Sequence, residues 1–211
     1  MSQHKPILLH GFDKSGHSHR AELMLRLLGL PFDFHQVDLI GGEQRGEAFL
    51  KLNPFGTVPV IEDNGVVIAD SCAILVYLAT KYDPDARWLP RDAEGAAQVQ
   101  RWLSVAQGPV FNGPCCARLV TVFGMDFDHA RAKAVAERLL TVLDGVLAGR
   151  TFLVGERPTI ADVALYSYIA HAPEGGVDLA PHAPVVAWLR RIEALPGFAP
   201  MPATKAGLRA A

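Results

Sequence analysis

Two hydroxyl side chains lie where a short apolar run gives way to a helical pattern. Ser15 and Ser18 follow the apolar run at 7–10, and residues 18–28 place apolar side chains at the spacing of one buried helical face. A hydroxyl at a helix start can cap free backbone N–H groups, or it can donate to an anion held there. On residue type alone, Ser15 is an ordinary loop serine and Ser18 a helix cap, while His17 faces solvent or adds a donor.

A predicted β-hairpin carries a proline at an unusual place. The runs 58–61 and 66–69 are typical of short strands, and Asn64-Gly65 between them readily takes the positive φ of a tight turn. Pro59 lies inside the first run and has no N–H to donate. We therefore expect this strand at an edge of the sheet, or with an unusual peptide bond, and an edge can pair with an extended peptide.

Asp70 and Ser71 stand directly after the hairpin and before the apolar run 73–78. This order predicts a buried helix with a carboxylate and a hydroxyl beside its first free N–H groups. An aspartate in this place usually only caps the helix. The same N–H groups can also hold a ligand carboxylate.

The order of elements indicates how these residues are brought together. A strand, a helix and a second strand in succession imply a right-handed crossover and a parallel pair of strands. The hairpin and its helix extend the order to βαβ-ββα. The expected elements are strands at 7–10, 30–39, 58–61 and 66–69, and helices at 18–28, 47–52 and 71–82.

The second half of the chain shows only helical patterns. Residues 83–91 carry two prolines and no periodicity, which is typical of a linker. The pairs 108–109 and 113–114 are both Gly-Pro and should break one long helix. A capping box at Thr159 and Asp162 begins another. Expected helices are 93–107, 115–123, 130–147, 159–169 and 185–195, giving a two-domain α/β plus all-α protein: domain 1–82, linker 83–91 and domain 92–211.

Composition limits the classes of function. The 211 residues include 20 basic and 22 acidic ones, half are apolar, and no basic block is present, which argues against nucleic acid and anionic membranes as partners. No signal-peptide core or membrane-spanning run is present, so we expect a cytoplasmic protein. Cys72, Cys115 and Cys116 are odd in number and lack metal-ligand spacing, and His17 and His19 would point to different faces of a helix. We expect no disulfide framework and no metal.

Three passages resemble one known family. NPFGTVPV followed by ADS, and GERPTIADVALYSYI further on, are similar to sequences of the cytosolic glutathione transferase superfamily, in its bacterial, serine-type, theta/phi/zeta-like branch. The resemblance covers nearly the whole chain. It implies an N-terminal thioredoxin-like βαβ-ββα domain, a C-terminal helical bundle, a cis bond before Pro59, a homodimer and a role in detoxification.

The resemblance also implies a chemistry for the serines. Ser15-Gly-His-Ser18 occupies the place of a thioredoxin CxxC, so the thiol must come from glutathione as co-substrate, with Ser15 as the hydroxyl that stabilises its thiolate and Ser18 as the competitor. A thiol of pKa ~8.5 must fall by about two units, or about 2.7 kcal/mol, to ionise near neutral pH. A donated hydroxyl can supply about 1.5–3 kcal/mol and a helix start about 0.3–1 more.

Three further parts of glutathione require binding partners: the cysteinyl backbone, the γ-glutamyl end and the glycine carboxylate. By the resemblance, its cysteinyl backbone pairs with Val58, its γ-glutamyl carboxylate meets Ser71, and its ammonium meets Asp70. Gln44 and Arg45 resemble the pair that holds the glycine carboxylate, although such a loop is often merely solvated. Thr57 departs from the glutamine of many relatives. The expected glutathione contacts are His17, Gln44, Arg45, Thr57, Val58, Pro59, Asp70 and Ser71.

The implied activity is attack of the glutathione thiolate on a small electrophile. We expect this second substrate between Phe12 and the broken helix around Trp102, Val105 and Phe111, although apolar residues at this spacing usually form core. Three alternatives stay open: glutathione-dependent peroxidase or disulfide reductase activity, a non-catalytic glutathione or ligand-binding scaffold, and a protein-interaction module without a cofactor.

Overall fold

A four-stranded mixed sheet forms the centre of the N-terminal half. The computed structural model describes residues 5–208. β1 (Ile7–Gly11) lies between β2 (Phe32–Gln36), to which it is parallel, and β3 (Val60–Asp63), to which it is antiparallel. β4 (Val66–Ala69) closes the hairpin with β3, so the strand order is β2-β1-β3-β4. The βαβ-ββα order expected from the sequence is confirmed.

Of the two alternatives expected for the strand at Pro59, the edge position is wrong and the unusual peptide bond is confirmed. β3 has neighbours on both sides, and the edges of the sheet are β2 and β4. The strand begins only at Val60, because Pro59 has no N–H for a ladder and therefore lies just before it. The bond between Val58 and Pro59 is cis, as the resemblance implies. Val58 thus takes part in neither ladder of β3.

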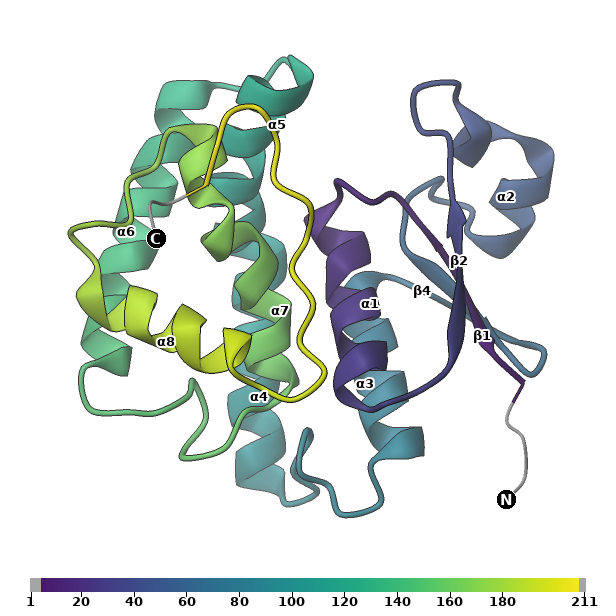
Figure 1. Ribbon diagram of the computed structural model, residues 1–211, viewed down its shortest axis with the longest axis horizontal. Helices are drawn as coiled ribbons and strands as arrows, with labels where there is room; N and C mark the ends of the chain where they lie inside the picture. The colour runs from purple at the N-terminus through teal and green to yellow at the C-terminus, as the bar shows by residue number, and fades with distance from the viewer. Residues whose placement is uncertain (1–4, 209–211) are drawn as a thin grey trace.

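Three helices and a short 3-10 turn complete this half. α1 (Gly16–Leu27) and α3 (Ser71–Tyr82) cover the sheet face that meets the rest of the chain, whereas α2 (Glu47–Leu52) lies on the other side (Figure 1). The 3-10 turn η1 (Glu43–Arg45) precedes α2. Because the two covering helices present their apolar faces to both the sheet and the second half, one core can cross between the halves.

The C-terminal half is helical, as expected. Apart from an isolated bridge between Phe152 and Gly155, its described residues form no strand. The chain after the last helix returns along α1 (Figure 1). The elements are α4 (Ala93–Val105), η2 (Ala106–Cys115), α5 (Cys116–Phe123), α6 (His129–Leu147), α7 (Ile160–Ala170), η3 (Ala172–Gly175) and α8 (Ala183–Glu193).

The two Gly-Pro pairs behave differently: the helix continues through 108–109, whereas the chain kinks at Gly113, so the second pair breaks the long helix as predicted. The chain passes through them as the π-helical segment η2, and within that segment only Gly113 leaves helical geometry, at φ −100° and ψ −105°. A π turn accommodates the missing N–H of Pro109 without ending the helix, whereas Pro114 follows the kink and α5 begins soon after it. A Cβ on Gly113 would lie 2.9 Å from the backbone nitrogen of Ala136 in α6, so the glycine also permits close helix packing.

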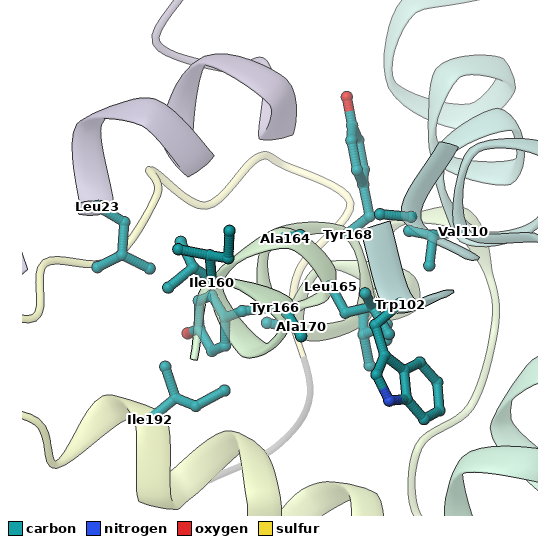
Figure 2. Packing of buried hydrophobic residues seen from close by; sticks show 14 of the residues in the cluster. Leu23, Trp102, Val110, Ile160, Ala164, Leu165, Tyr166, Tyr168, Ala170 and Ile192 are labelled. Atoms are coloured by element: carbon teal, nitrogen blue, oxygen red, sulfur yellow. The ribbon is translucent and has the colours of Figure 1, made fainter. Parts of the chain in front are cut away.

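α7 is the central helix of the whole molecule. All of its residues are buried. Figure 2 shows Leu23 of α1 and Ile192 of α8 on one side of it, with Trp102 and Val110 on the other. The same hydrophobic cluster includes residues of the sheet and of α3, so the two halves share one core.

The capping box at the start of α7 is confirmed. Thr159 is the N-cap, and its hydroxyl accepts from the N–H of Ala161. The Asp162 carboxylate is fully buried and accepts from Thr159 N at 2.8 Å, Leu153 N at 3.0 Å and Trp188 Nε1 at 2.9 Å. This one side chain therefore joins the loop before α7, the helix itself and α8.

Between residues 5 and 208, none of the helices has both the length and the apolar character needed to span a membrane. All three cysteines are buried free thiols. The sequence prediction that they form no disulfide framework is confirmed.

Candidate active site

The start of α1 presents one accessible hydroxyl. Ser15 is the N-cap in extended geometry, and its Oγ accepts from Ser18 N at 3.3 Å. It is half-buried, and accepting this bond leaves its own hydroxyl hydrogen free to donate. Ser18 is only 1% exposed, and its Oγ accepts from Phe12 N at 3.0 Å. The prediction that Ser18 is the helix cap is wrong because the helix begins two residues earlier than expected.

Gly16 allows this helix start to approach α7. A Cβ at this position would lie 2.8–2.9 Å from ring atoms of Tyr168. Any other residue would push the first turn of α1 away from the aromatic ring. The glycine between the two serines is therefore required by packing.

His17 is held between the starts of two helices instead of facing solvent. Its Nδ1 lies 2.9 Å from Arg20 Nη1 and 3.3 Å from the Ser71 hydroxyl. A guanidinium only donates, so Nδ1 accepts and the ring proton is on Nε2. Burial, and then the charge of Arg20, lower the pKa of His17 to about 3, so the ring is neutral. The rings of Tyr168 and Phe111 lie 5.0 and 6.1 Å away.

Arg20 is a fully buried cation beneath these residues. Its Nη1 also donates to Ser71 Oγ at 3.2 Å, but its Nε and Nη2 have no hydrogen-bond partner among the described residues. The guanidinium lies 5.5 Å from the centre of the Tyr168 ring. A buried charge without a carboxylate partner is costly, and it favours negative charge nearby. The site can therefore stabilise an anion.

Asp70 begins α3 in a strained conformation. Its φ is +74°, a region that residues other than glycine rarely adopt. Oδ1 accepts from Cys72 N at 2.8 Å and Ala73 N at 3.1 Å, which caps the helix. Oδ2 accepts from Gln107 Nε2 at 2.7 Å, a contact with the helical half of the chain. The carboxylate is exposed, so a ligand cation can still approach it.

A second polar group lies around the loop before β3. Gln44 donates to a backbone carbonyl at 3.3 Å, and its buried Oε1 has no partner in the described chain, while Arg45 is exposed. A Cβ on Gly56 would lie 2.9 Å from the carbonyl oxygen of Gln44, so η1 touches this loop. Thr57 is exposed, and its carbonyl and hydroxyl oxygens accept from Asn53 Nδ2 at 2.8 and 3.0 Å.

The four predicted substrate-binding residues separate into two groups. Phe111 lies beside His17, and Phe12 lies in the loop before α1 with its ring 6.2 Å from that of Phe123. Trp102 is 3% exposed and belongs to the core, as Figure 2 shows, and the half-buried Val105 packs against that core. The structure therefore brings only Phe12 and Phe111 to the start of α1.

The protein's own thiols are not poised for nucleophilic chemistry. Burial raises the pKa of Cys115 to about 12, and it also raises the pKa of Cys72. Both therefore remain protonated near neutral pH, and a reacting thiol has to come from a ligand. In residues 5–208 no three His, Cys, Asp or Glu side chains gather in a way that could hold a metal ion.

Two residues of the site, Tyr168 and Gln107, were not predicted from the sequence, and a third, Arg20, was indicated only by the family resemblance. The sequence predicts Tyr168 only as part of an apolar helix, although its ring contacts both His17 and Arg20. The sequence places Gln107 at the end of a predicted helix, and no residue near it in the sequence indicates a hydrogen bond to Asp70. Arg20 had one usable signal, because it matches the helix arginine of the family resemblance.

Comparison with known proteins gives one consistent result. Residues 15–81 match the family profile "Glutathione S-transferase, N-terminal domain", and residues 126–196 match "Glutathione S-transferase, C-terminal domain". The chain is 33% identical over 179 residues to the glutathione S-transferase theta-1 of Rattus norvegicus, which covers 80% of this chain and 74% of the relative.

Solved structures agree with the sequence comparison. A glutathione S-transferase from Pseudomonas fluorescens has a TM-score of 0.88 and 32% identity, covering 93% of this chain and 99% of that one. A glutathione transferase homologue from Drosophila mojavensis with bound glutathione has a TM-score of 0.79 and 32% identity, covering 90% and 89%. The fold, the serine at the start of α1 and these relatives together establish that the chain belongs to the glutathione S-transferase family.

Proposed function

We propose that Ser15 of this glutathione transferase holds the thiol of bound glutathione as a thiolate. The observation that carries the proposal is the geometry of the cap: Ser15 Oγ accepts from Ser18 N and keeps its hydrogen for the sulfur. The required stabilisation is about 2.7 kcal/mol, which a donated hydroxyl and a helix start can together supply. The buried charge of Arg20 adds to the same effect.

The other ends of glutathione have matching groups nearby. The hydroxyl and backbone N–H of Ser71 suit the γ-glutamyl carboxylate, since the Asp70 cap uses the N–H groups of Cys72 and Ala73, and Asp70 suits the ammonium. The cysteinyl backbone would pair with Val58, which neither ladder of β3 uses. The remaining contacts of the proposed tripeptide site are His17, Gln44, Arg45, Thr57 and Pro59.

The thiolate then attacks an electrophilic carbon of a small second substrate. A carbon–sulfur bond forms while the leaving group departs with its electron pair, or while a strained ring opens, so no external oxidant or reductant is needed. Phe12 and Phe111 would provide the apolar wall for this substrate. We give no such role to Trp102, which the core already encloses.

We also propose that the enzyme works as a cytoplasmic homodimer with a role in detoxification. The support for the dimer is the edge strand β4, where Val66 and Val67 are 42% and 40% exposed, next to a groove between α3 and α4 lined by Ile68, Val76 and Leu103 among others. The unpaired thiols support the location. Analytical ultracentrifugation of the native chain and of Val66→Glu tests the dimer, which the glutamate should weaken.

Ser15→Ala is the decisive test of the chemistry. Ultraviolet titration of bound glutathione measures its thiol pKa, which we expect to rise by about one to two units in this variant, with kcat/KM near neutral pH falling about 10- to 100-fold. Ser18→Ala is the matched control and should leave the thiol pKa unchanged. If only Ser18→Ala raises the pKa, the proposal is wrong.

A panel of halides, epoxides, isothiocyanates, peroxides and mixed disulfides identifies the class of second substrate. Turnover of the carbon electrophiles supports the proposed reaction, whereas turnover of peroxides or disulfides alone replaces it with reduction. Glutathione binding detected by calorimetry without a thiolate signal would indicate a binding scaffold.

A further inference from the structure

A buried ion pair lies under the loop that carries Ser15. Arg118 of α5 and Glu174 of η3 are 1% and 0% exposed, and Arg118 Nε donates to Glu174 Oε2. A Cβ on Gly175 would lie 2.7 Å from Arg118 N, so the two elements are in direct contact. Burying such a pair generally gives little or no stability over an apolar replacement. Its contacts therefore point to a purpose other than stability.

Arg118 reaches out of the helical half to the loop before α1. Its Nη1 donates to the carbonyl oxygen of Lys14 at 2.8 Å, and Lys14 directly precedes Ser15. The guanidinium also lies 5.6 Å from the ring of Phe123, and that ring lies 6.2 Å from Phe12 at the other end of the loop. The same arginine thus supports both ends of the short loop.

Hydrogen bonds within the loop connect the position of the Lys14 carbonyl to that of the Ser15 hydroxyl. Ser15 N donates to the carbonyl of Phe12 at 2.8 Å, which makes the segment a tight turn. Lys14 lies inside this turn, so a shift of its carbonyl changes the direction in which Ser15 Oγ points. A misplacement of about 1 Å in such a group can cost about 100-fold in rate.

Glu174 fixes the guanidinium and connects it to the C-terminal segment. Its Oε1 accepts from Thr204 N at 2.6 Å, while Oε2 accepts from Arg118. Although burial raises the pKa of Glu174, the bonds from Arg118 and Thr204 lower it below its usual range, so the carboxylate is ionised. His171 lies 3.2 Å from the same carboxylate, but burial lowers its pKa to about 4, so it is neutral near pH 7.

We infer that Arg118 is a positioning residue for the thiolate-stabilising hydroxyl, and that Glu174 and the segment around Thr204 set the direction of its guanidinium. The inference rests on the role proposed for Ser15. This role of Arg118 is indirect and requires no contact with glutathione or the electrophile. It holds the carbonyl of Lys14, and through it the geometry of the hydrogen bond that Ser15 donates to sulfur.

The test uses the double variant Arg118→Met/Glu174→Gln, which leaves no buried charge without its partner. We expect the thiol pKa of bound glutathione to rise by about one unit and kcat near neutral pH to fall about 10-fold, while KM for glutathione stays within about twofold. Arg118→Lys should restore part of the effect, because an ammonium can reach one of the two acceptors but does not form the planar fork.

The control is a buried carboxylate far from Ser15. Asp63 is 1% exposed and accepts from Tyr77, Lys81 and Tyr82 between β3 and α3. Asp63→Asn should lower the melting temperature without moving the thiol pKa. If it moves the thiol pKa as much as the double variant does, the effect is general loosening and the inference is wrong.

Ser15→Ala, titrated in parallel, separates the two proposals. If Ser15→Ala raises the thiol pKa and the folded double variant does not, the inference is overturned and the proposed function stands. If Ser15→Ala has no effect, both are overturned. Should the double variant not fold, Thr204→Pro decides, since it removes the N–H that Glu174 accepts and keeps both members of the ion pair. A smaller rise in thiol pKa supports the inference, and an unchanged pKa overturns it.

Discussion

Two helix starts in this molecule use the same capping chemistry with opposite results. At α7, the Asp162 carboxylate accepts four hydrogen bonds and is completely buried. At α1, the Ser15 hydroxyl accepts a single bond and remains partly exposed. The carboxylate at α7 has no hydrogen-bond acceptor position left for a ligand, so this cap can only stabilise the fold. The second keeps a free hydrogen, and this remaining capacity makes it a candidate for chemistry.

The buried arginines show the same contrast. Arg118 is matched by Glu174, so its charge is balanced within the protein. Arg20 has no carboxylate partner among the described residues, and two of its nitrogens are unpaired. A balanced buried charge directs neighbouring groups, whereas an unbalanced one favours an incoming anion. At the start of α1, a hydroxyl with a free hydrogen (Ser15) and a buried positive charge without a carboxylate partner (Arg20) therefore occur together.

The largest effect is expected at the closed helix start. Asp162→Ala removes the acceptor of four buried donors and should lower the free energy of unfolding by about 3–5 kcal/mol, measured by denaturant titration. Trp188→Phe removes only one of these donors and should cost clearly less. A loss below about 1 kcal/mol for Asp162→Ala would contradict the idea that this cap is wholly structural.

Next in size is the close approach at Gly16. Gly16→Ala brings a Cβ within 3 Å of the Tyr168 ring and should cost about 1–3 kcal/mol of stability, together with a loss of kcat/KM. Gly145→Ala in α6 is the matched control: nothing lies within 4 Å of its Cβ, and the change should stabilise the helix by about 0.5–1 kcal/mol. Equal shifts of the melting temperature for the two substitutions would contradict the idea that the close contact between Gly16 and Tyr168 excludes a larger side chain.

Acid should act on the buried histidines. Burial lowers the pKa of His19, and it lowers the pKa of His171 to about 4, so both bind protons more weakly in the folded chain than in the unfolded one. Stability is therefore complete above about pH 6.5 and declines as pH falls towards the folded pKa values, by about 1 kcal/mol at pH 5.5 for His171. Denaturant titrations at several pH values measure this slope, and His171→Gln should reduce it. A slope of opposite sign would contradict the assignment.

The smallest effect is expected where α3 begins. Gln107→Ala releases Asp70 Oδ2 from its contact with the helical half, and the freed oxygen can accept from the ammonium of glutathione. We expect KM for glutathione to fall about two- to threefold, with kcat unchanged. Gln100→Ala, an exposed change on the same long helix, serves as the control. A rise in KM would instead indicate that Gln107 itself binds the tripeptide.

Local motifs allowed much of this fold to be predicted. Asn64-Gly65 with flanking apolar residues predicted the hairpin, and Thr159 with Asp162 predicted the start of α7, because both signals depend only on neighbours in sequence. The errors are also local. The hydroxyl of Ser18 looked like a cap because the apolar pattern starts there, but the helix adds one earlier turn. Pro59 was placed inside a strand that in fact begins after it.

The candidate site was predicted only in part, because its contacts join distant segments. The bond from Arg20 to Ser71 spans 51 residues, and that from Arg118 to Lys14 spans 104. A single sequence carries no signal for such pairs. Trp102 illustrates the converse: its spacing is typical of core residues, and the structure places it in the core and not beside the second substrate.

The segment after α8 has a consequence for the order in which the protein matures. It accepts a hydrogen bond from His19 of α1 through the carbonyl of Ala199, and it donates one to Glu174 through Thr204. Ribosomes release a chain from its N-terminus, so the sheet and its serine emerge long before these contacts can form. A nascent chain halted ahead of residue 199 would display the N-terminal half without these two anchors, which can form only after Ala199 and Thr204 have been synthesised.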